Sequence, residues 1–106
     1  MGTERRKMTK SEIAKATGTP ALLEQVAEEC MELAHACIKA ARKIRGESFT
    51  PSDKTTLSYK LHEETEDVIN SIDVLHYNGT LDYDMVSEIA NAKMARWSER
   101  VAMRSQ

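Results

Sequence analysis

The sequence predicts an all-α protein. Three long segments repeat apolar residues with helical periodicity, no stretch alternates convincingly as a strand, and the linkers are short. The 106 residues, 41% hydrophobic and 30% charged, suit a single domain with one core. Three amphipathic helices form only a thin bundle. We therefore expect a helical bundle that is completed by dimerisation, with much of each apolar stripe covered by a second copy of the chain.

Capping signals predict where each long helix begins and ends. Thr19 is a residue type that caps helices, and Pro20, which follows it, suits the first turn of a helix. Thr50 and Asp53 are spaced like a capping box, and Gly79 after Asn78 is typical of a left-handed C-cap. The expected helices are Thr19 to about Gly46, a start within 50–53 to Asn78, and about Asp82 to Met103.

The first eighteen residues are expected to form a basic N-terminal segment, with a short helical turn over 11–15. Residues 19–104 are then expected to form the single all-α domain. The stretch Glu4-Arg5-Arg6-Lys7 has the composition of a solvated terminus. This division places the function in the three long helices.

Charge and hydropathy exclude several classes of function. A net charge of −2 and a pI near 5.9 argue against nucleic-acid binding, which favours a basic excess. No apolar stretch approaches the length of a membrane span, and the first ten residues are too polar for a secretory signal. We expect a cytoplasmic protein without membrane contact. Cys30 and Cys37, about 10.5 Å apart along one helix, are too distant for a disulfide and are expected to be core thiols in a reducing compartment.

Two pairs of acidic residues carry the main functional signal. On the first long helix Glu29 lies within the apolar stripe, about 40° from Leu33, and Glu32 lies on the same side. Glu64 and Asp67 repeat this i, i+3 arrangement on the second. Buried carboxylates need compensation, and only Lys60 lies one turn away. Antiparallel packing would bring four carboxylates together, where Mg²⁺ or Mn²⁺ would relieve their repulsion. The alternative is that these acids are solvated boundary residues of a charged bundle.

The third helix supplies cations. Its apolar face begins with Met85, Val86 and Ile89 and continues as Lys93, Arg96 and Arg100. A face that turns from apolar to cationic suits an anionic ligand such as a phosphate chain bridged to a carboxylate-bound Mg²⁺. The alternative is that the cations neutralise acids of the bundle.

These motifs resemble the MazG-like all-α nucleoside triphosphate pyrophosphohydrolases. The shared pattern is Glu29-x-x-Glu32, a spacer, and Glu64-x-x-Asp67, followed by Asn91-x-Lys93-x-x-Arg96-Trp97, which is similar to the basic signature on the family's last core helix. The resemblance covers about residues 20–100. The spacer of thirty-one residues between Glu32 and Glu64 exceeds the shortest versions, and 47–58 is the expected insertion.

The resemblance implies Mg²⁺-dependent hydrolysis of a nucleoside or deoxynucleoside triphosphate to the monophosphate and pyrophosphate. It implies that Glu29, Glu32, Glu64 and Asp67 ligate the metal, with Mn²⁺ as a possible substitute, and that Lys93 and Arg96 contact phosphates. Glu29 or Glu32 would act as the general base. Lys54 and Arg100 are further candidate phosphate contacts. The family's members form homodimers or dimers of dimers, with the nucleotide held between chains.

Two other functions fit parts of the sequence. A carboxylate-bridged di-iron bundle would use the i, i+3 pairs Glu32-x-x-His35 and Asp73-x-x-His76, although these pairs are displaced from the acidic stripe. A non-catalytic oligomeric interaction module would use the same acids and bases for ion pairs between subunits. Such a module would keep its thermal stability in EDTA and release no pyrophosphate.

Overall fold

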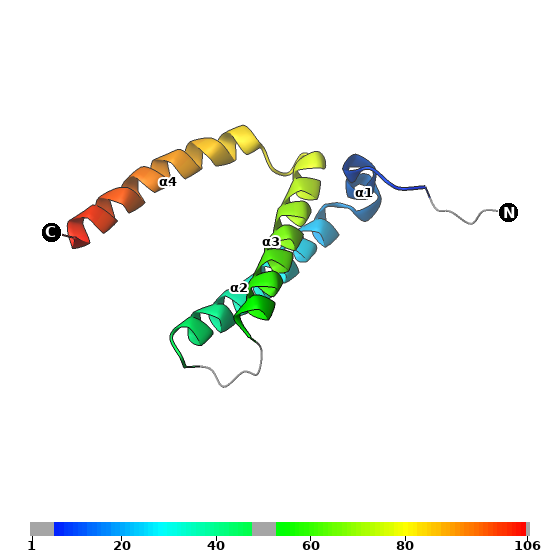
Figure 1. Cartoon of the computed structure of the whole chain (residues 1–106). Coiled ribbons are helices and arrows are strands. Elements are labelled where there is room, and N and C mark those ends of the chain that lie inside the picture. Colours follow the sequence, from blue (N-terminus) through cyan, green and yellow to red (C-terminus); the bar gives the residue numbers. More distant parts are fainter. Residues whose placement is uncertain (1–5, 48–52, 106) are drawn as a thin grey trace.

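The computed structural model describes residues 6–47 and 53–105, which form four helices and no strand (Figure 1). The helices are α1 (Lys10–Thr17), α2 (Thr19–Ile44), α3 (Lys54–Tyr77) and α4 (Tyr83–Arg104). The all-α prediction is therefore confirmed for the described residues. None of these helices is both long enough and apolar enough to cross a bilayer.

Short polar side chains cap three of the helices. Thr9 and Glu12 form a reciprocal capping box at the start of α1, which extends over two turns instead of the single turn expected. Asp53 accepts a hydrogen bond of 2.7 Å from the backbone N–H of Thr56 and is itself the cap of α3. Thr50, its expected capping partner, lies outside the described residues. Asp82 caps α4 in the same way.

Helices α2 and α3 run side by side in opposite directions, and α1 packs across one end of the pair (Figure 1). The core at that end contains Ala14 of α1, Leu22 of α2 and Leu75 of α3, each at most 5% exposed. Ala36 and Leu57 are buried nearer the other end. Residues 10–17 thus contribute to the core although the sequence placed them in a basic N-terminal segment.

The face of α2 that meets α3 differs from the expected apolar stripe. Leu22 and Ala36 are buried on it, with Glu29 and Leu33 half-buried between them. The prediction that Cys30 and Cys37 are core thiols is wrong, because both are exposed in this chain. The physical reason is that α2 is apolar around more of its circumference than one neighbouring helix covers, so apolarity alone did not identify the buried side.

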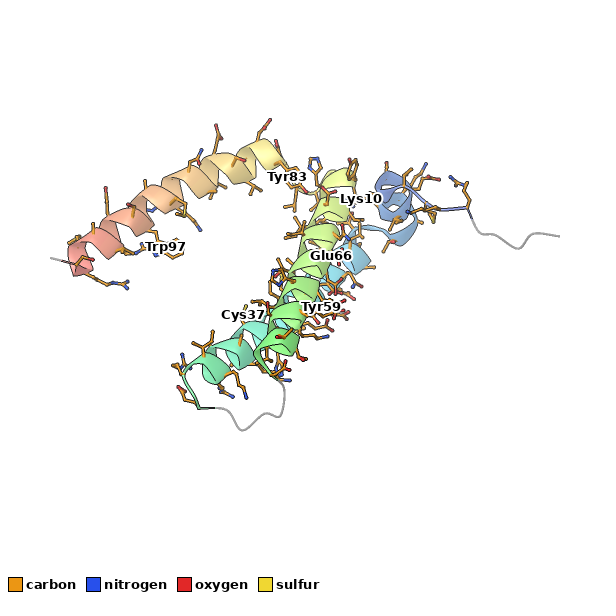
Figure 2. The ribbon with its side chains drawn as sticks, viewed as in Figure 1. Lys10, Cys37, Tyr59, Glu66, Tyr83 and Trp97 are labelled. Carbon is orange, nitrogen blue, oxygen red and sulfur yellow. The ribbon has the colours of Figure 1, made fainter. Side chains whose placement is uncertain are left out.

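Helix α4 extends away from the other three helices as an arm (Figure 1). Every residue from Asp82 to Ser105 is exposed. The large side chains Val86, Met94 and Trp97 are between 46% and 55% exposed, and Figure 2 places Trp97 far from the bundle. The described chain measures 64 × 40 × 20 Å along its principal axes, because the arm adds length without adding core.

Candidate metal centre

The two acidic pairs converge between α2 and α3. Glu29 and Glu32 come from adjacent turns of α2, and Glu64 and Asp67 from adjacent turns of α3. Each residue places one carboxylate oxygen within 4.8 Å of the corresponding oxygens of the other three. Antiparallel packing of two helices, each with acids at i and i+3, produces this arrangement. The convergence expected from the spacing is therefore present within a single chain.

The carboxylates of this acidic cluster differ in exposure and in hydrogen bonding. Glu64 is only 4% exposed, and its Oε1 lies 2.9 Å from Nζ of Lys60. Gln25 donates a hydrogen bond of 2.6 Å to Oε1 of Glu29. The second oxygens, Oε2 of Glu29 and Oε2 of Glu64, are buried without a hydrogen-bond donor. Buried oxygens without a donor are costly. Lys60 supplies one positive charge beside Glu64, whereas Gln25 gives Glu29 only a hydrogen bond from a neutral amide.

Mutual repulsion alters the ionisation of the acidic cluster. A hydrogen bond with Glu64, together with repulsion from the carboxylates of Glu64 and Glu29, raises the pKa of Glu32. The hydrogen bond from Lys60 lowers the pKa of Glu64. Next to the cluster, a hydrogen bond with Asp67 raises the pKa of Glu66. Four acids in this space thus favour proton uptake at Glu32, and a bound cation would compete with that proton.

A cavity of about 450 Å³ opens beside Glu29 and Asp67. Its wall is partly apolar and partly polar, with contributions from α1, α2 and α3. The lining residues are Lys10, Ile13, Thr17, Leu22, Gln25, Glu29, Asp67, Asn70, Ser71 and Val74. Sequence reasoning missed this cavity because α1, which forms one side of it, was not expected to pack on the bundle.

A smaller cavity of about 290 Å³ lies on the other side of the acidic cluster, beside Glu32 and Glu64. Lys39 of α2 and Lys60 of α3 line it, together with His35 and Ala36. From the sequence, Lys60 is expected only as a partner of Glu64, and Lys39 is not among the predicted site residues. Their spacing would have indicated them, since Lys39 lies two turns after Glu32 on the same helix and Lys60 one turn before Glu64.

The predicted phosphate contacts lie elsewhere in the single chain. Lys93, Arg96 and Arg100 are on the exposed arm α4, which does not pack along α2 or α3. The chain by itself therefore does not bring them to the acidic cluster. Lys54 is the first residue of α3, and its side chain lies outside the described residues.

The two histidine pairs considered for di-iron binding do not meet at the cluster. Asp73 instead accepts hydrogen bonds of 2.6 Å from both Lys10 and the hydroxyl of Tyr83. His76 stacks on the ring of Tyr83 at a centroid distance of 4.0 Å, and His35 is exposed. In the described parts of the chain, the group with metal-binding geometry contains only the four acids. Its oxygen-only donor set suits Mg²⁺ or Mn²⁺ better than softer metals.

Comparison with known protein families, curated proteins and solved structures finds no match to the chain. The family expected from the motifs therefore stays a prediction.

Proposed function

We propose that the protein hydrolyses a nucleoside or deoxynucleoside triphosphate to the monophosphate and pyrophosphate, using a divalent cation. The observation that carries the proposal is the convergence of four carboxylates from α2 and α3, two of which bury an oxygen without a hydrogen-bond donor. A purely structural cluster would be expected to pair those oxygens. A cation supplies the missing positive charge.

The donor set fits Mg²⁺, with Mn²⁺ as a substitute, because both ions prefer oxygen ligands. Glu29, Glu32, Glu64 and Asp67 would hold the cation. When bound, it would neutralise phosphate charge and lower the pKa of a coordinated water. We assign the general base to Glu32 or Glu29. The raised pKa of Glu32 and its exposure to solvent suit proton uptake from the attacking water.

The cavities on either side of the acidic cluster suit the two parts of a nucleotide. Lys39 and Lys60 give the smaller cavity the positive charge that a phosphate chain requires. The larger cavity combines apolar groups with the amides of Gln25 and Asn70, and its volume is within the range of ligand sites, about 300–1,000 Å³. We therefore place the nucleoside in the larger cavity and the leaving pyrophosphate beside the lysines.

Self-association completes the proposed site. The exposed apolar side chains of α4 would be covered by a second copy, in a homodimer or a dimer of dimers. Lys93 and Arg96, with Arg100 farther along the same helix, would then reach the acidic cluster of that copy. There they would stabilise the negative charge that develops on the phosphates.

The direct test is a panel of common ribonucleoside and deoxyribonucleoside triphosphates incubated with Mg²⁺ and assayed for pyrophosphate and monophosphate. We expect both products in equal amounts from at least one substrate. Glu29→Gln should reduce turnover by about 100-fold or more, since it removes a cation ligand. The matched control is Glu28→Gln, which alters an exposed neighbour and should leave turnover unchanged. Absence of pyrophosphate with every substrate, or full turnover by Glu29→Gln, would overturn the proposal.

A second candidate is a non-catalytic helical interaction module, which the unpartnered apolar arm α4 favours. In that case the acids would form ion pairs between subunits and would need no cation. Thermal unfolding separates the two functions. An interaction module keeps its Tm when EDTA is added, whereas the proposed enzyme gains stability from Mg²⁺ with a nonhydrolysable nucleotide.

A further inference from the structure

Helix α2 carries a second apolar seam that α3 leaves mostly uncovered, except near its C-terminal end, where Ile44 lines a cavity with Leu57 and Leu61 of α3. The residues of this outer seam follow one another at alternating intervals of four and three, the spacing of helices that pack along their length. All are exposed except Ala41, which is half-buried. The outer seam consists of Leu23, Ala27, Cys30, Ala34, Cys37, Ala41 and Ile44.

The outer seam has the same pattern of side-chain sizes in both directions from its centre, Ala34. A cysteine lies on each side, and the large residues Leu23 and Ile44 form the two ends. A two-fold symmetric contact requires a surface that is complementary to itself after reversal. Antiparallel pairing of two such seams places Cys30 opposite the partner's Cys37 and Leu23 opposite the partner's Ile44.

Along one edge of the outer seam, residue types also match in reverse order: two large apolar residues lie in the middle, and the two ends carry opposite charges. Residues at seven-residue intervals along this edge are Glu24, Met31, Ile38 and Arg45. Met31 is 65% and Ile38 is 52% exposed. Arg45 pairs with Glu47 of its own chain. In an antiparallel pair, corresponding edges meet, so Glu24 would face the partner's Arg45 beside that ion pair, while Met31 would contact the partner's Ile38. A parallel pair would instead bring the acidic halves of both helices together.

From size pattern and charge together, we propose that α2 packs antiparallel against α2 of a second copy, with the two-fold axis at Ala34. The alanines in the outer seam permit a close approach of the two helices, since interaxial distance depends on the side chains at the contact. The proposal adds a contact along α2, with a defined orientation, to the self-association through α4 proposed above. It does not require that the protein hydrolyses nucleotides.

Oxidative cross-linking of the native thiols tests the orientation. Diamide accepts two electrons and two protons as two thiols form one disulfide. We expect a covalent dimer from the wild-type protein. Cys30→Ser and Cys37→Ser should each fail to cross-link, because identical cysteines of the two copies would be about 10.5 Å apart along the axis. A mixture of the two variants, equilibrated before oxidation, should cross-link again.

The other outcomes of this experiment contradict the proposal. A parallel pair would let each single-cysteine variant cross-link on its own. No cross-link in the wild-type protein would mean that the outer seam does not meet a second copy in this register. Activity assays on the same samples keep the two proposals separate. Cross-linking as expected without any hydrolysis would overturn the proposed enzyme only.

A charge placed on the proposed axis tests the surface independently. Ala34→Glu brings two carboxylates together at the centre of the contact, and we expect it to raise the Kd of dimerisation at least about tenfold. The matched control is Ala21→Glu, which adds the same charge to an exposed position of α2 about 140° around the helix. Sedimentation equilibrium measures the Kd, and circular dichroism verifies that both variants stay helical. A wild-type Kd for Ala34→Glu would overturn the proposal.

Discussion

Helices α2 and α4 are of similar length, but their surroundings differ. Helix α2 has α3 along one side and uses that contact to bury Leu22, Ala36 and part of the acidic cluster. Helix α4 has no buried residue, although Val86, Ile89, Trp97 and Val101 would be suitable for a core. In proteins most of the stability of a helix comes from packing of its apolar face against a neighbour. One chain therefore assembles the acidic cluster by itself, whereas it leaves the apolar side chains of the arm exposed.

The largest expected effect on stability lies in the bundle. Leu75 is 3% exposed, so Leu75→Ala should lower the free energy of unfolding by about 2–5 kcal/mol. Val101→Ala in the arm should cost less than about 0.5 kcal/mol in dilute protein, and its cost should grow with protein concentration if a second copy covers α4. Urea denaturation at two protein concentrations measures both. If both substitutions lowered the free energy of unfolding equally in dilute protein, the claim that the bundle is packed and the arm is not would be contradicted.

The next effect concerns the contribution of the arm to catalysis. Arg96→Ala should lower kcat/KM by about 10- to 100-fold, because it removes a positive charge from the proposed phosphate site. Arg104→Ala, at the far end of the same helix, serves as the control and should retain wild-type activity.

Mixing variants shows whether Arg96 acts in the other chain. If the arm serves the partner's site, an equilibrated mixture of Arg96→Ala and Glu29→Gln should recover roughly a quarter of the wild-type activity, because half of the dimers are mixed and each has one intact site. No recovery in exchanging dimers would contradict the shared site.

A smaller effect is expected at the junction between bundle and arm, where Asp73 accepts hydrogen bonds from Lys10 of α1 and Tyr83 of α4. These hydrogen bonds lower the pKa of Asp73 below its ordinary 3.8. The stabilisation is therefore present above that value and is lost as the pH falls below it. Asp73→Asn should lower Tm at neutral pH, and the difference from wild type should shrink below about pH 4. If the difference in Tm between Asp73→Asn and wild type stayed constant as the pH fell, the ionised carboxylate of Asp73 would not be the source of the stabilisation.

The smallest expected effect is on the pH at which one tyrosine ionises, which ultraviolet absorbance measures. The hydrogen bond to Asp73 raises the pKa of Tyr83 from 10.0 to about 12. Because the pKa is raised on folding, this contribution is present below pH 10 and is lost as the pH rises through about 12. Near-ultraviolet titration should show one of the three tyrosines ionising last, and Tyr83→Phe should remove that phase. Persistence of the late phase would place it on Tyr59 or Tyr77.

The acidic cluster was predictable because two properties of the sequence coincide. Glu29 interrupts an apolar stripe, and Glu64 does the same on the next helix, each with a second acid one turn away. Helix geometry then brings the pairs together as soon as the two helices pack antiparallel. The C-cap signal at Gly79 placed the end of α3 for a similar reason, since it acts through neighbouring residues.

The errors arise where burial depends on which neighbour a helix meets. Cys30 and Cys37 are as apolar as the residues that face α3, so the sequence alone could not distinguish the inner from the outer side of α2. Ala14 was overlooked because charged residues surround it on a short helix, although it is 2% exposed in the core. Lys93 and Arg96 cannot be assigned to the acidic cluster from one chain, because their surroundings depend on what α4 packs against.

The central claim is that the carboxylates of α2 and α3 share a divalent cation, and Mn²⁺ binding measured by electron paramagnetic resonance tests it most directly. Glu63 and Glu64 both pair with Lys60, at 3.0 and 2.9 Å, but only Glu64 belongs to the acidic cluster. We predict that wild type and Glu63→Gln bind Mn²⁺ equally and that Glu64→Gln binds at least about tenfold more weakly. Equal Mn²⁺ affinity in all three proteins would contradict the claim.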